Sequence, residues 1–76
     1  MELNDFISDF ANQFDETDIN VFTYKTSFRD LDEWSSLIAL SVMAMIDEEY
    51  DVQITADEMR NANTICELFE IVKSHL

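Results

Sequence analysis

The chain has 76 residues, of which 47% are hydrophobic and 12% aromatic, and its 4 basic and 17 acidic residues give a formal net charge of −13. This length allows one domain that buries only about 60% of the unfolded chain's surface, which argues against a large enclosed active site. The aromatic content excludes a disordered acidic tail, and the negative charge excludes proteins that bind nucleic acid or anionic membranes, because both ligands would be repelled.

The chain opens with apolar residues at helical spacing. They recur at intervals of three and four residues, so they share one stripe of a helix, while polar residues fill the other face. The stripe consists of Leu3, Phe6, Ile7, Phe10 and Phe14. This spacing predicts a first helix from Leu3 to Asp15.

The helical period fails from Glu16 to Ser35, where residues that favour turns and caps alternate with scattered apolar ones. So long a loop is unusual in a small domain, and such loops are often functional. Its aromatic residues indicate that it packs against the rest of the chain. Lys25 and Arg29 are its only basic residues, and we expect them to neutralise acids nearby.

A second helix is predicted to begin near Ser35 or Ser36 and to continue to Tyr50. Either serine has a hydroxyl that can act as the N-cap, because it can accept a hydrogen bond from an unpaired backbone N–H group. The absence of glycine and proline means that caps such as this one, rather than strong helix breakers, mark the boundaries.

Two later helix starts carry the T-x-x-E spacing of a capping box, in which Thr and Glu each satisfy a backbone N–H group of the other. One begins at Thr55 and opens a short helix to about Asn61, and the other begins at Thr64 and opens a last helix. No strand-like alternation of useful length is present. The predicted fold is all-α: residues 1–76 form a single four-helix bundle with three longer helices, one short third helix and a long first loop.

On a helical wheel the second helix is apolar on both sides. The side predicted to face the core holds Leu40, Met43, Ile46 and Tyr50, with Ala39 and Val42 beside them. The opposite side holds Leu37, Ile38, Ala44 and Met45, with Ser41 and Glu48 between them. A helix that is apolar all round is hard to bury in so small a domain, so we interpret the second side as a partner-binding surface. The alternative is a central helix whose second side is covered by the long loop.

The entrance to this helix reads Asp30-Leu31-Asp32-Glu33-Trp34-Ser35-Ser36-Leu37. It resembles the acyl carrier and peptidyl carrier protein family, whose signature is an Asp-Leu pair followed by Asp-Ser-Leu at the start of the second helix. Phe28 before the pair, the acidic and aromatic residues 47–51, the short third helix and the Thr-capped fourth helix are also similar to the family. The resemblance covers nearly the whole chain.

The resemblance implies that Ser36 receives 4′-phosphopantetheine from coenzyme A through a phosphodiester bond made by a phosphopantetheinyl transferase. The thiol of this arm carries acyl or aminoacyl groups as thioesters, so the chain is expected to be a non-catalytic carrier. A hydroxyl at a helix N-terminus also lies beside unpaired N–H groups, which favour a phosphate. The expected partners are ligase, synthase and transferase enzymes with basic or apolar docking surfaces. The residues expected to contact them are Leu37, Ile38, Ser41, Met45 and Glu48.

Two departures from the family pattern affect the expected site. Ser35 stands where the family usually has Asp, which removes a negative charge and makes Ser35 a competing attachment site. Ile38 and Ser41 stand where fatty-acid carriers often have acids, so recognition is expected to be more apolar. These differences favour a dedicated carrier in a specialised fatty-acid, polyketide, peptide or cell-envelope pathway. Trp34 is interpreted as a plug of the loop, the alternative being that it packs beside the arm. The acids expected to retain the charge are Glu33, Asp47 and Glu48.

Other signals are weaker. Residues 47–58 place acids at positions of an EF-hand loop, but Val52 stands where the sharp turn needs glycine, so no metal site is expected. Cys66 is the single cysteine, and we interpret it as a half-buried filler. The N-terminus lacks the pattern of a signal peptide, and Leu37–Ile46 is shorter than the ~20 residues that span a bilayer, so a cytoplasmic location is expected. The chain is also expected to be a monomer. The alternative function is an acidic helical interaction module without a prosthetic group.

Overall fold

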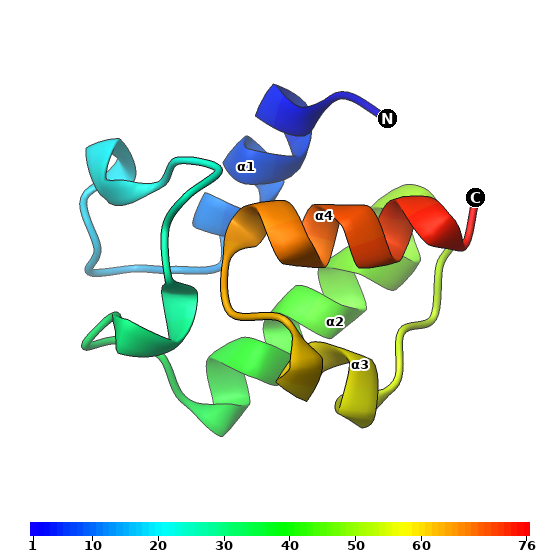
Figure 1. The fold of residues 1–76 in the computed structure, drawn as a ribbon. Helices are drawn as coiled ribbons and strands as arrows, with labels where there is room; N and C mark the ends of the chain where they lie inside the picture. The colour runs from blue at the N-terminus through cyan, green and yellow to red at the C-terminus, as the bar shows by residue number, and fades with distance from the viewer.

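Four helices carry the fold in the computed structural model, which describes all residues from 1 to 76. They are α1 (Leu3–Ala11), α2 (Ser36–Tyr50), α3 (Ala56–Asn61) and α4 (Ile65–Ser74), and the long connection before α2 contains the 3₁₀ turns η1 (Ile19–Val21) and η2 (Phe28–Asp30). Figure 1 shows α4 crossing α2, α1 beside them, the short α3 at the base and the connection at one side. The all-α prediction is confirmed, and no helix is both long and apolar enough to cross a membrane.

Aromatic rings fill the junction between α1 and the connection. The Phe10 ring is fully buried and stacks on Trp34, with centroids 6.5 Å apart and an interplanar angle of 7°. The Phe28 ring is also fully buried, and its centroid lies 4.8 Å from that of Trp34. Such pairs add stabilisation beyond the area that they bury. The half-buried Trp34 thus packs against the rings of α1 and η2, which fits its interpretation as a plug of the loop.

The first helix is shorter than predicted, because it ends at Ala11 rather than Asp15. After Ala11 the backbone continues in tight turns, with N–H groups of Gln13 and Phe14 bonded three residues back. Phe14 remains buried, so its apolar side chain follows the helical spacing without being in the helix. The helical spacing therefore predicted the burial of Phe14 correctly, but it overestimated the length of α1.

The connection is fastened to the start of α4 by backbone hydrogen bonds. The N–H group of Cys66 donates to the carbonyl of Tyr24 at 2.9 Å, and the N–H group of Ile65 donates to that of Thr26 at 3.2 Å. These first-turn N–H groups have no partner within a helix, so the connection supplies what the helix end lacks. The connection is thus packed down, as its aromatic residues predicted.

The caps of the later helices are those that the spacing predicted. Both capping boxes form, with Thr55 paired to Glu58 and Thr64 paired to Glu67. At the other end of α2, Asp51 takes the left-handed conformation, with φ of 57°, that usually falls to glycine at a helix end. Because the chain has no glycine, Asp51 makes this turn, which Asp and Asn tolerate better than most residues.

Candidate functional site around Ser36

The two serines at the start of α2 have different roles. Ser35 is the N-cap, with an extended backbone, and its hydroxyl oxygen accepts a hydrogen bond of 3.2 Å from the N–H group of Ile38. Ser36 is the first residue of the helix, and it is exposed. No acidic residue lies in the first turn of α2. The Ser36 hydroxyl is therefore open to solvent, whereas the Ser35 hydroxyl is engaged in the cap.

The outer face of α2 is apolar along its first half and acidic at its end. Leu37 and Leu40 are 73% and 62% exposed, Ala44 is exposed one turn later, and Asp47 and Glu48 follow. We call Leu37, Leu40 and Ala44 the α2 stripe. Leu37 and Leu40 therefore form a small exposed apolar patch next to Ser36.

The predicted faces of α2 are wrong at two positions. Met45, expected on the partner surface, is only 6% exposed and lies in the core, whereas Leu40, expected in the core, lies on the outer face. Ile38 and Ser41, also expected to meet partners, are half-buried, while Leu37 and Glu48 are exposed as predicted. The physical reason is that α2 is apolar almost all round, so its periodicity does not define one inward side and packing decides its rotation.

A groove of about 370 Å³ runs between the first half of α2 and α3. Its volume lies at the small end of the range for ligand pockets, roughly 300–1,000 Å³. Apolar side chains and two arginines line it, and Ser36 lies at its edge. The lining residues are Arg29, Trp34, Ser36, Ala39, Leu40, Met43, Ala56, Met59 and Arg60.

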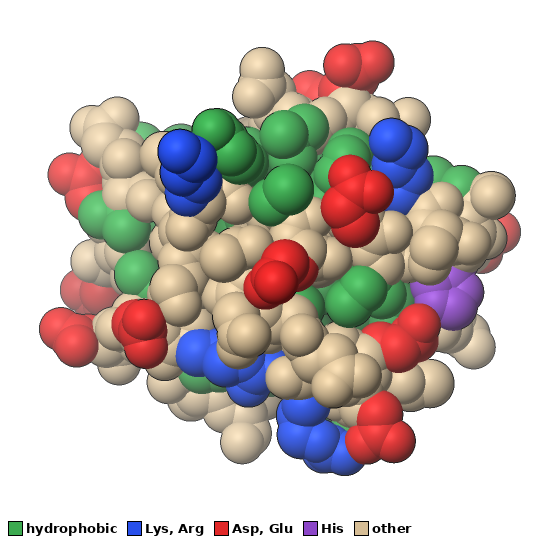
Figure 2. All heavy atoms as spheres, viewed as in Figure 1, with side chains coloured by type: hydrophobic (Ala, Val, Ile, Leu, Met, Phe, Trp, Pro, Cys, Tyr) green, Lys and Arg blue, Asp and Glu red, His purple; other side chains and the backbone are tan.

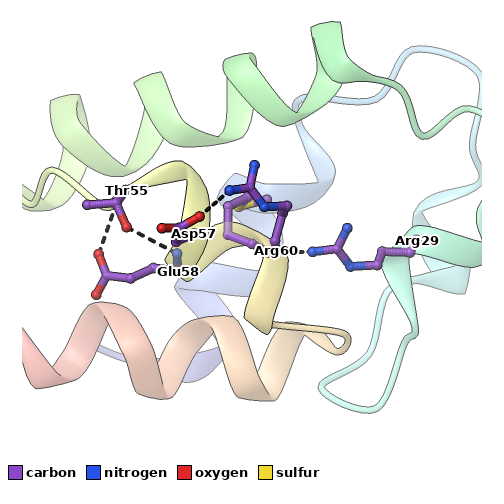
Figure 3. Close-up of polar contacts among 6 residues, drawn as sticks. Arg29, Thr55, Asp57, Glu58 and Arg60 are labelled. Atoms are coloured by element: carbon purple, nitrogen blue, oxygen red, sulfur yellow. Dashed lines mark hydrogen bonds and ion pairs between the residues drawn. The ribbon is translucent and has the colours of Figure 1, made fainter.

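Arg29 crosses from η2 to the end of α3, where it caps the helix. Its Nε donates to the carbonyl of Ala62 at 3.0 Å, and its Nη2 donates to that of Met59 at 2.6 Å. The expectation that Arg29 neutralises a nearby acid is wrong, because its partners are backbone carbonyls, which are unpaired at a helix end. Figure 3 shows Arg29 reaching α3, on which Arg60 is paired with Asp57. Neither arginine is assigned to this groove from the sequence, because no spacing in the sequence relates residue 29 to α3.

On the other side of the entrance to α2, an acidic hollow of about 540 Å³ opens to solvent. One of its carboxylates, that of Glu33, also holds the connection: it accepts hydrogen bonds from the N–H groups of Asp15 and Glu16 and from the Thr17 hydroxyl, at 2.7 to 3.0 Å. These bonds, that from Thr17 foremost, hold the pKa of Glu33 below its usual range. The acidic residues of the hollow are Glu16, Asp30, Asp32 and Glu33.

The remaining side chains that carry chemistry are placed away from this site. Cys66 is half-buried at the start of α4, as expected, and the imidazole Nε2 of His75 lies 2.7 Å from Oε2 of Glu58. No group of three or more His, Cys, Asp or Glu side chains is placed to hold a metal ion. In comparisons with known proteins, no family model, no curated protein and no solved structure matches the chain.

Proposed function

We propose that the chain is a carrier domain that holds acyl or aminoacyl groups as thioesters on a 4′-phosphopantetheine arm attached to Ser36. One observation carries the proposal: the residue that the resemblance selects is an exposed serine at the first position of α2, next to an exposed apolar stripe. A buried Ser36, or a Ser36 engaged as the cap, would have argued against it. In this role the chain catalyses nothing and serves as substrate for its partner enzymes.

The residues at the start of α2 fit this group. Attachment joins the Ser36 oxygen to the phosphorus next to the pantetheine in coenzyme A, the bond to adenosine 3′,5′-bisphosphate breaks, and the hydroxyl proton leaves. The arm supplies a thiol on which an acyl group is held as a thioester. The protein's contribution is the exposed oxygen and a helix N-terminus without a carboxylate in its first turn, which favours the added negative charge.

Partner enzymes would dock on the α2 stripe and the acids around it. Leu37, directly after Ser36, and Leu40, about one turn further along α2, supply exposed apolar area next to Ser36. Asp47 and Glu48 lie at the far end of the stripe, and the acidic hollow lies before its near end. A partner with an apolar patch rimmed by basic residues complements this surface, and the charge of −13 would speed the encounter.

The exposure of Leu37 and Leu40 also favours a second candidate function. An acidic helical interaction module would use the same stripe to bind a partner, with no arm attached. The two functions differ in covalent chemistry, because only a carrier is modified on Ser36.

Intact-protein mass tests the proposal directly. The chain is incubated with coenzyme A and a phosphopantetheinyl transferase of broad specificity. A gain of one phosphopantetheine, followed by transfer of an acyl group to its thiol by a ligase, supports the carrier. If several such transferases add nothing to a folded chain, the interaction module becomes the better account.

A further inference from the structure

The groove between α2 and α3 combines an apolar lining with a cationic end. The chain has 4 basic residues, and Arg29 and Arg60 both line this groove, which Ser36 also lines. Figure 2 shows two neighbouring groups of basic side chains in the lower part of this face, one of them at its lower edge, while two further basic side chains lie at the top and acids are scattered between them. In a chain of net charge −13, Arg29 and Arg60 give the groove a local preference for an anion with an apolar stem.

Arg29 is held in place before any ligand binds. Its Nε and Nη2 are bonded to the carbonyls of Ala62 and Met59, and a guanidinium has five N–H donors, so three remain free. A fixed, planar guanidinium loses little side-chain entropy when it binds an oxyanion. Arg29 is therefore a preorganised donor to a phosphate.

Arg60 can exchange its partner. It is paired with Asp57 within the same helix, but the two side chains are 67% and 82% exposed. Exposed pairs of this kind contribute little to stability. A phosphate can therefore replace the Asp57 carboxylate at Arg60 at small cost, since the exposed carboxylate returns to water.

The cationic end of the groove is the end nearer to the start of α2. Arg29 belongs to η2, the last element before α2, and it bonds to the final turn of α3, which also carries Arg60. Figure 3 shows Arg60 on the side of α3 that faces α2, with Arg29 approaching the same helix from η2. Met43 lies two turns into α2 from Ser36, so the groove extends from its charged end along an apolar wall.

We propose that Arg29 and Arg60 bind the phosphate group of the arm carried by Ser36, and that the apolar wall receives the pantetheine chain. This inference rests on the proposed carrier function and deepens it. The arm then rests along α2 instead of extending into solvent, and a docking partner must release it. The phosphate is bound as a charge-assisted hydrogen-bond acceptor by both guanidinium groups.

The test uses the unmodified chain and free ligands, so that it does not depend on loading. ¹⁵N-labelled protein is titrated with 4′-phosphopantetheine and with pantetheine, which lacks the phosphate. We expect phosphopantetheine to bind about tenfold more tightly than pantetheine, which is the difference that one charge-assisted hydrogen bond predicts. Its binding should also shift the amide signals of Leu40, Met43 and Met59. Arg60→Gln should weaken its binding by about twofold to fivefold.

Matched variants separate a specific clamp from the loss of any positive charge. Lys25→Gln and Lys73→Gln remove the same charge from residues outside the groove, and both should bind phosphopantetheine as the wild type does. Arg29→Lys keeps the charge but loses the fork, and it should weaken binding provided that its circular dichroism shows an intact fold. In the loaded protein, the ³¹P chemical shift of the phosphodiester should change in Arg60→Gln and should be unchanged in Lys25→Gln.

Several results would overturn the inference. They are equal affinity for phosphopantetheine and pantetheine, absence of binding by both, or an effect of Lys25→Gln as large as that of Arg60→Gln. Binding of S-succinylpantetheine but not of phosphopantetheine would also overturn it, because the anion would then be a carboxylate of the cargo. Failure of the carrier function has a different signature, since it is seen as absence of added mass on Ser36 whatever the titrations give.

Discussion

The phenol of Tyr50 donates a hydrogen bond of 2.6 Å to Oδ2 of Asp9, which joins the last residue of α2 to α1. The Tyr50 ring also packs on the fully buried ring of Phe6, with centroids 5.8 Å apart. The end of α2 is therefore fixed by one polar and one aromatic contact, while its start carries the candidate site. α2 is thus anchored to α1 at the end opposite Ser36.

Replacement of Tyr50 by Phe keeps the ring and removes the bond to Asp9. We expect the free energy of unfolding to fall by about 1 kcal/mol, the typical net contribution of one hydrogen bond. Urea unfolding at neutral pH measures this change. Tyr24→Phe is the matched control, because Tyr24 is exposed and its hydroxyl bonds to no other residue. Equal stabilities of the two variants would show that the Asp9 bond contributes nothing.

The same contact predicts sensitivity to alkali. Burial, together with the hydrogen bond to Asp9, raises the pKa of Tyr50 above its ordinary value. An unfolded tyrosine titrates near pH 10, so the unfolded chain loses this proton first. The stabilisation is complete below about pH 10 and is lost as the pH rises toward the folded pKa. A melting temperature that falls above pH 10 no faster in the wild type than in Tyr50→Phe would contradict this assignment.

Glu33 predicts sensitivity to acid. Hydrogen bonds from Thr17 and from two backbone N–H groups lower its pKa, so its stabilisation is present above the unfolded value of about 4.3. That stabilisation is lost as the pH falls through the folded pKa. Glu33→Gln should lower the melting temperature at neutral pH. On acidification, the melting temperature of this variant should fall less than that of the wild type. Glu70→Gln, an exposed acid on α4, is the control and should follow the wild type.

The two sides of α2 should respond differently to truncation. Met45 is 6% exposed, and Met45→Ala should lower the free energy of unfolding by about 2–3 kcal/mol through lost burial and a cavity. Leu40 is 62% exposed, and Leu40→Ala should cost less than about 1 kcal/mol. Leu40→Ala should instead impair use by partner enzymes. Similar unfolding curves for the two variants would mean that α2 is rotated differently.

Local signals predicted the later part of the fold well. The T-x-x-E spacings at Thr55 and Thr64 both form capping boxes, and a serine hydroxyl caps α2 as expected. These features need only residues three apart in the sequence, so tertiary structure does not change them. The sequence left open which of the two serines is the cap, and the structure assigns the cap to Ser35 and the first helical position to Ser36.

Long-range contacts set what the sequence left open. The length of α1 is limited by a chain reversal in which Glu33 bonds to the N–H groups of Asp15 and Glu16. The rotation of α2 is decided by packing, because an almost wholly apolar helix has no single apolar side. Arg29 meets α3 through bonds between residues about thirty apart, which no local pattern announces.

The central claim is that Ser36 carries the arm, and site-resolved mass measurement tests it most directly. The wild type, Ser35→Ala and Ser36→Ala are each incubated with coenzyme A and a phosphopantetheinyl transferase, after circular dichroism has shown that they fold. Ser35→Ala loses an N-cap, which costs about 1 kcal/mol, but keeps the attachment site. The account predicts one added phosphopantetheine on the wild type and on Ser35→Ala, and none on Ser36→Ala. Addition to Ser36→Ala, or to none of the three proteins, would contradict it.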